Sequence, residues 1–150
     1  MAIARGSGTE ILCSAHFETG TDSTQDLIVG VQHHIYTVLS IIVFANGLNA
    51  SGDMYRVWVA GWDSKQGLDT QSMYVFRHNF TDQYSTYVWN DKFSFNGYAP
   101  VDYTGPLNTE AEQNANADQG GGQNQKLQSD ATHGSDDFDV HVTFIDQNNS

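Results

Sequence analysis

The sequence has very little cysteine and little positive charge, and each shortage excludes a class of protein. Cys13 is the only cysteine, so the chain has no internal disulfide. Six Lys and Arg stand against eighteen Asp and Glu, which gives a formal net charge of -12 over 150 residues. Nucleic-acid binding needs clustered basic residues, and an acidic exterior repels phosphate. We therefore expect neither nucleic acid nor an anionic membrane as a partner.

Long apolar runs are also missing. Residues 1–8 lack the extended apolar stretch of a signal peptide. The longest apolar run, around residues 41–45, is far shorter than the roughly 20 residues that cross a bilayer. The sequence therefore predicts no membrane span. A reduced cysteine and the missing signal are consistent with synthesis in a cytoplasm.

Apolar residues alternate with polar ones along most of the chain. Residues 9–18 place Cys13 and His16 on opposite faces of a strand, which argues against a cysteine–histidine catalytic pair. Residues 35–44 are apolar at nearly every position, which predicts burial on both faces. About eight or nine strands at regular spacing predict an antiparallel β-sandwich, like a jelly roll. The expected strands are residues 9–18, 26–31, 35–44, 54–62, 72–80, 84–89, 92–95, 126–132 and 138–146.

Residues 99–137 have a different composition, with both prolines and many Asn, Gln and Gly. We expect a long polar loop here, with one short helix at residues 110–119. Thr109 and Glu112 form a capping-box pattern at its start. The expected organisation is an N-terminal arm, residues 1–8, followed by one β-sandwich domain, residues 9–150.

Two histidine-containing segments invite a metal hypothesis. His33 and His34 could belong to a cupin-like metalloenzyme, but neighbouring strand residues point to opposite faces and would not chelate one ion. The later cluster could hold Ca²⁺ through carboxylate and backbone oxygens, although its spacing is not that of an EF-hand. That cluster comprises His133, Asp136, Asp137, Asp139 and His141. We predict no cofactor, no metal and no catalytic residue, hence no enzyme.

The large aromatic side chains have two competing explanations. They could form a sugar-stacking platform, as in a carbohydrate-binding β-sandwich module. They could also fill a core or a subunit interface, where Tyr and Trp are favoured, and this is the explanation that their period-two placement favours. The set is Trp58, Trp62, Tyr84, Tyr87 and Trp89.

Four stretches of the chain resemble small virion structural proteins of tailed bacteriophages. They are MAIARG at residues 1–6, QHHIYTVLS at 32–40, VWNDKFSFNGYAP at 88–100 and VTFIDQNN at 142–149. The resemblance implies a non-enzymatic capsid decoration (cement) protein that binds and stabilises the shell. A tail, fibre or neck component of the virion is the alternative.

This resemblance also implies partners and a location. The implied partners are the major capsid protein or other virion proteins. The chain is also expected to form a homo-oligomer, with a trimer favoured. Its implied location is the virion. We expect the arm to reach a neighbouring subunit by strand addition or packing. The predicted interface residues are Ile3, Arg5, Trp58, Trp62, Tyr87 and Trp89.

Overall fold

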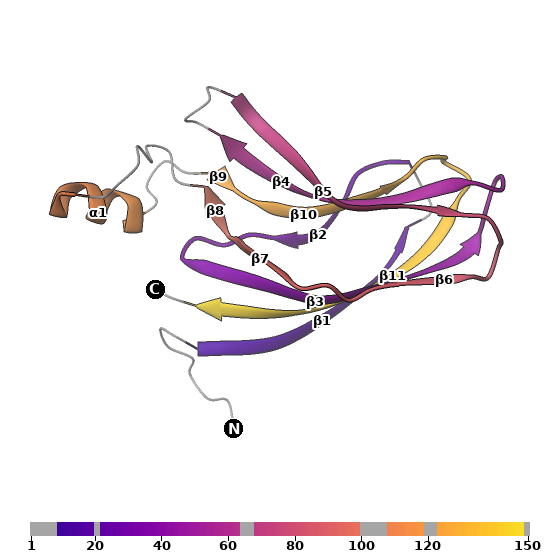
Figure 1. The fold of residues 1–150 in the computed structure, drawn as a ribbon, viewed down its shortest axis with the longest axis horizontal. Helices are drawn as coiled ribbons and strands as arrows, with labels where there is room; N and C mark the ends of the chain where they lie inside the picture. The colour runs from indigo at the N-terminus through magenta and orange to yellow at the C-terminus, as the bar shows by residue number, and fades with distance from the viewer. Residues whose placement is uncertain (1–8, 20–21, 64–67, 100–107, 119–122, 149–150) are drawn as a thin grey trace.

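The computed structural model describes residues 9–19, 22–63, 68–99, 108–118 and 123–148. These residues form two stacked antiparallel sheets, with a short helix projecting from one end (Figure 1). The predicted all-β sandwich is confirmed. The expected arm, residues 1–8, lies outside the described residues, and so do Ile3 and Arg5.

The first sheet, called sheet A here, contains the first strand of the chain at its edge and the last strand beside it. Its strands run in the order β1 (Thr9–Thr19), β11 (Asp137–Asn148), β3 (His34–Gly47) and β6 (Thr86–Trp89), and β7 (Phe93–Asn96) also pairs with β3. The N-terminal strand β1 pairs with the C-terminal strand β11 over eleven residues without a break.

The second sheet, sheet B, runs in the order β2 (Gln25–Val29), β10 (Lys126–Ala131), β4 (Asp53–Asp63) and β5 (Leu68–Phe80). A separate two-stranded ribbon pairs β8 (Tyr98–Ala99) with β9 (Gln123–Asn124). The chain passes from one large sheet to the other after β1, β2, β3, β5 and β10, and it returns from β7 to sheet B through the ribbon. This connectivity is that of a jelly roll.

Side chains from the inner faces of both sheets form one core. Val38, Ile41 and Val43 of sheet A meet Tyr55 and Val57 of sheet B, and all five are fully buried. The outer side of β3 is different, because Ile35 and Ile42 are 36% and 37% exposed. The prediction that residues 35–44 are buried on both faces is therefore wrong. In an antiparallel sandwich each sheet covers only one face of its strands.

The segment expected to be a polar loop around residues 99–137 contains a central strand. β10 lies between β2 and β4, and its Leu127, Ser129 and Ala131 are buried. The described part of this segment is therefore not all loop. The strand predicted at residues 126–132 is confirmed.

The predicted helix is confirmed as α1 (Glu110–Asp118). The Glu112 amide donates to Thr109 Oγ1 at 3.2 Å, and Glu112 Oε2 accepts from the Thr109 amide at 3.2 Å. This reciprocal capping box satisfies two backbone donors that a helix start leaves open. No helix in the described part of the chain is long and apolar enough to cross a membrane.

Candidate functional site: an exposed sheet face and its surroundings

The predicted interface residues do not gather at one place. Trp58 lies on the outer face of sheet B, only 8% exposed, and its Nε1 donates to Gln128 Oε1 at 3.2 Å. Its ring centroid lies 5.7 Å from that of Tyr74. Trp62 belongs to β4, but its side chain lies outside the described part of the structure.

Tyr87 and Trp89 instead point between the sheets and pack against the core. The Tyr87 ring stacks on His78, with centroids 4.0 Å apart, and burial lowers the pKa of that histidine. Trp89 meets Phe93 edge to face at 5.4 Å. The described aromatics of the predicted platform therefore occupy different faces. Contact with another subunit stays a prediction for all six interface residues.

The two adjacent histidines have separate environments. His33 lies in a turn with φ of 66°, and His34 begins β3 with its Nδ1 2.6 Å from Asp146 Oδ1. Nearby, Tyr36 Oη accepts a hydrogen bond from the Val31 amide at 3.1 Å. Burial and the Asp146 carboxylate raise the pKa of Tyr36 to about 12. Within the described residues, no three His, Cys, Asp or Glu side chains are arranged to hold a metal.

The side chains of the acidic cluster considered for Ca²⁺ point in different directions. Asp136 is fully buried, whereas Asp137 accepts a hydrogen bond from Asn46 Nδ2 at 2.8 Å in an exposed position. Asp139 and His141 lie on the outer side of sheet A, opposite Phe44 and Ile42 of β3. The cluster therefore does not converge on one point, although Asp136 has its own partner in Asp53.

The outer side of sheet A is the most distinctive surface of the described structure. Directly opposite residues of neighbouring strands share a face, so the pairing registers place its apolar side chains together. Leu12 is 70% exposed and Val88 is 53% exposed. We call this surface the sheet A face, and its exposed apolar residues are Leu12, Ile35, Ile42, Val88 and Tyr84, which stacks on Phe44.

Apart from histidine, the charged side chains on the strands of the sheet A face are all acidic. Strands β1, β3, β6, β7 and β11 contain no Lys or Arg. Their outer positions include Glu10, Glu18 and Asp139, and the ring centroids of His16 and His141 lie 5.9 Å apart in one cross-strand row. The face thus combines exposed apolar area with acidic side chains.

The basic residues of the strands all belong to sheet B. Arg56 binds Asp130 with two hydrogen bonds, Nε to Oδ1 at 2.7 Å and Nη2 to Oδ2 at 2.6 Å. Lys126 Nζ lies 3.4 Å from Asp26 Oδ2, and the Arg77 guanidinium lies 5.1 Å from the centre of the Tyr74 ring. The two sheets therefore present different charge to solvent.

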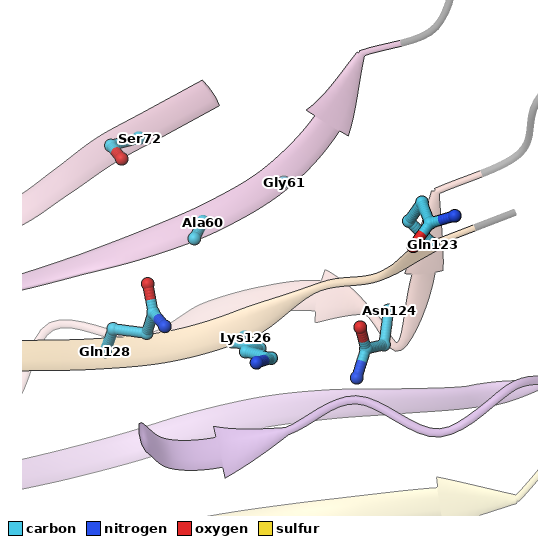
Figure 2. A pocket seen from close by; sticks show the side chains of 7 residues that line it. All are labelled: Ala60, Gly61, Ser72, Gln123, Asn124, Lys126 and Gln128. Atoms are coloured by element: carbon cyan, nitrogen blue, oxygen red, sulfur yellow. The ribbon is translucent and has the colours of Figure 1, made fainter. Parts of the chain in front are cut away.

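A shallow polar hollow of about 280 Å³ lies on sheet B. Lys126, Ala60 and Ser72 face one another across β10, β4 and β5. Figure 2 shows the small residues Ala60 and Gly61 of β4, with Ser72 of β5 on one side and the longer Lys126 and Gln128 of β10 on the other. The remaining lining residues are Gln123 and Asn124. The hollow offers hydrogen-bond donors and acceptors but little apolar area.

Comparison with known proteins gives distant structural likeness alone. No family model matches the chain, and no curated protein matches it. The fold is similar to that of a solved Bacillus endospore appendage protein, from a family described as disulfide-linked pili, with 10% identity and a TM-score of 0.47. The match covers 100% of this chain and 97% of the other. A likeness this distant carries no argument about function.

Proposed function

We propose that the chain is a non-enzymatic structural protein of a phage particle, most simply a capsid decoration protein. In this proposal it sits in the virion, associates with the major capsid protein or with further copies of itself, and performs no turnover. The sequence resemblance to small virion proteins supports it. So does the sheet A face, which is the observation that carries the proposal.

The sheet A face has the properties of a contact surface for another protein. Exposed apolar residues that lie together on one side of a monomer indicate an interaction site more often than scattered ones do. Its acidic residues complement a partner with basic side chains, which would steer association and fix its orientation. A shell protein with Lys or Arg around an apolar patch fits both features.

Two exposed apolar positions test the proposal. Leu12→Asp and Val88→Asp place a charge in the proposed contact, and binding to particles assembled without this chain should weaken by about tenfold or more, as for buried contact residues. Co-sedimentation measures the bound copies. Met73→Asp on β5 is the matched control, because Met73 is 73% exposed and lies in sheet B. Equal binding by all three variants would refute the sheet A face as the contact.

The position within the particle follows from copy number and symmetry. A decoration protein should occupy the shell in many copies, in three-fold clusters if it is a trimer. A tail, fibre or neck component should be found in tens of copies or fewer at one vertex. Cryo-electron microscopy of the native particle distinguishes the two.

The polar hollow on sheet B favours a second candidate, a carbohydrate-binding module. Its amide, hydroxyl and ammonium groups can bond to sugar hydroxyls, and Tyr74 beside it is 45% exposed. Trp89 is a poor test position because it packs against the core. Asn124→Ala with Ser72→Ala should instead abolish binding on a glycan array while the thermal unfolding midpoint is kept. An array with no bound glycan excludes this candidate.

A further inference from the structure

Two loops meet at the end of the sandwich where β3 passes to β4 and β10 passes to β11. Asp136 lies immediately before β11, and Asp53 is the first residue of β4. Asp136 is fully buried, which is unusual because an ionised carboxylate loses its hydration there. Its surroundings must therefore compensate for that loss.

Backbone amides hold one oxygen of each carboxyl group. Asp136 Oδ1 accepts a hydrogen bond from the Asn49 amide at 2.8 Å, and Asp53 Oδ2 accepts one from the Ala50 amide at 3.0 Å. The Asp136 amide donates to the His133 carbonyl at 3.1 Å. Both side chains are thus fixed by the loops that they join.

The remaining oxygen of Asp136 has no donor facing it. Its Oδ2 is buried and unpaired, yet the Asp136 carboxyl lies within hydrogen-bonding reach of the Asp53 carboxyl. Two ionised carboxylates only accept hydrogen bonds, so a bond between them exists only when one carries a proton. A single proton therefore accounts for both observations.

The charges around Asp136 act in opposing directions. Burial is the largest influence and raises the pKa of Asp136, while the Asn49 amide lowers it. Asp53 raises it further through the hydrogen bond and through its charge, and His133 lowers it. The net effect is a pKa above the ordinary value for aspartate.

We propose that Asp53 and Asp136 form a carboxyl–carboxylate pair that holds one proton and acts as an acid-stabilised latch between the two loops. Like charges at short range disfavour ionisation of both groups, so the pair keeps its proton where isolated aspartates have lost theirs. Loss of the proton leaves the fully buried Asp136 carboxylate beside the negative charge of the half-buried Asp53. The two loops then separate. This latch does not depend on the proposed assembly function.

The sign of the pH dependence follows from linkage. The folded chain holds a proton that the unfolded chain releases near the ordinary aspartate pKa of about 4. The stability from the latch is therefore fully present below about pH 4, and it is lost as the pH rises through the raised pKa of the folded state. Amide variants remove this dependence, because an amide donates the hydrogen bond at every pH.

The test compares urea unfolding of the wild type with Asp136→Asn from about pH 3 to about pH 8. The unfolding midpoint of the wild type should fall relative to that of the variant as the pH rises. Asp139→Asn, on the outer side of sheet A, is the control and should follow the wild type. Parallel curves for the wild type and Asp136→Asn would overturn the proposal.

Two further measurements keep the test decisive. If Asp136→Asn does not fold, Asp53→Asn carries the same expectation, and ¹³C NMR of the aspartate carboxyl carbons in the wild type reports the titration directly. The Asp136 carbon should titrate above the ordinary aspartate range, because burial and the Asp53 carboxyl raise its pKa. Ca²⁺ is the alternative occupant of the site. If Ca²⁺ raised the unfolding midpoint of the wild type but not of the amide variants, and chelation reversed the rise, the site would bind a metal ion and the shared-proton proposal would be overturned.

Discussion

Two glycines allow the backbone of three segments to approach closely. Gly30 and Gly97 lie where three segments cross, and a Cβ on Gly97 would lie 2.0 Å from the Val31 carbonyl oxygen. The Gly30 amide donates to the Gln125 carbonyl, and the Gln125 amide donates to the Gly97 carbonyl, both at 2.8 Å. These bonds connect the end of β2 to the ribbon of β8 and β9.

Replacing Gly97 should therefore be costly. In Gly97→Ala the new methyl meets fixed backbone rather than a movable side chain, so the segments must separate, and we expect a loss of about 2–3 kcal/mol in the free energy of unfolding. Chemical denaturation measures this loss. Gly47→Ala is the control, because its nearest neighbour, the Asp137 Cβ, would lie at an ordinary 3.4 Å. Equal stability of the two variants would contradict the close approach.

Adjacent residues of the same type have different surroundings in the structure, and the local sequence does not predict them. Asp136 is buried beside Asp53, while Asp137 reaches Asn46 at the surface. His34 pairs with Asp146, 112 residues away, whereas His33 lies in a turn. Strand alternation predicts that such neighbours point to opposite faces. It cannot predict the partners, because they come from distant segments.

At the scale of elements, period-two alternation was a reliable guide wherever large apolar residues mark one face. Strands β1, β4 and β11 begin and end within about two residues of their predictions. The cysteine and the histidine of β1 lie on opposite faces, as alternation predicts. Each of these strands turns one face toward the core and the other away from it, and this produces the alternation of apolar and polar residues that sequence analysis detects.

Strand β10 was correctly predicted at residues 126–132, although its apolar pattern is weak. Its buried positions are Leu127, Ser129 and Ala131, and two of these are small. The surrounding Asn, Gln and Gly suggested a loop. Its place in the centre of sheet B depends on pairing with β2 and β4, which lie far away in sequence. Helix α1 was easier, because the capping box is a local hydrogen-bonding pattern.

For the whole molecule, the separation of charge between the two sheets is the property that sequence reading could not find. The six basic residues are scattered along the chain. Only the strand order shows that Arg56, Arg77 and Lys126 share sheet B and that sheet A has none in its strands. The predicted interface consisted of Ile3, Arg5 and four aromatic residues instead, and two of those aromatics pack against the core.

The strand order also makes the C-terminal segment indispensable to the fold. β11 lies between β1 and β3, so ending the chain at Asp136 removes the strand that joins the N-terminal strand to the rest of sheet A. Phe138, Val140 and Val142 are fully buried, and each contributes about 1.5–3 kcal/mol. Together they approach the whole stability of a typical domain, about 5–15 kcal/mol.

The truncated chain should therefore lack a cooperative unfolding transition in urea, followed by circular dichroism and Trp fluorescence. Asn114→Pro is the matched control, because it breaks the exposed helix α1 and should leave the transition of the sandwich intact. A truncated chain that still unfolds cooperatively would mean that β1 reaches the sheet without β11. Since the described β1 pairs with β11 along its whole length, that outcome would require a different strand order.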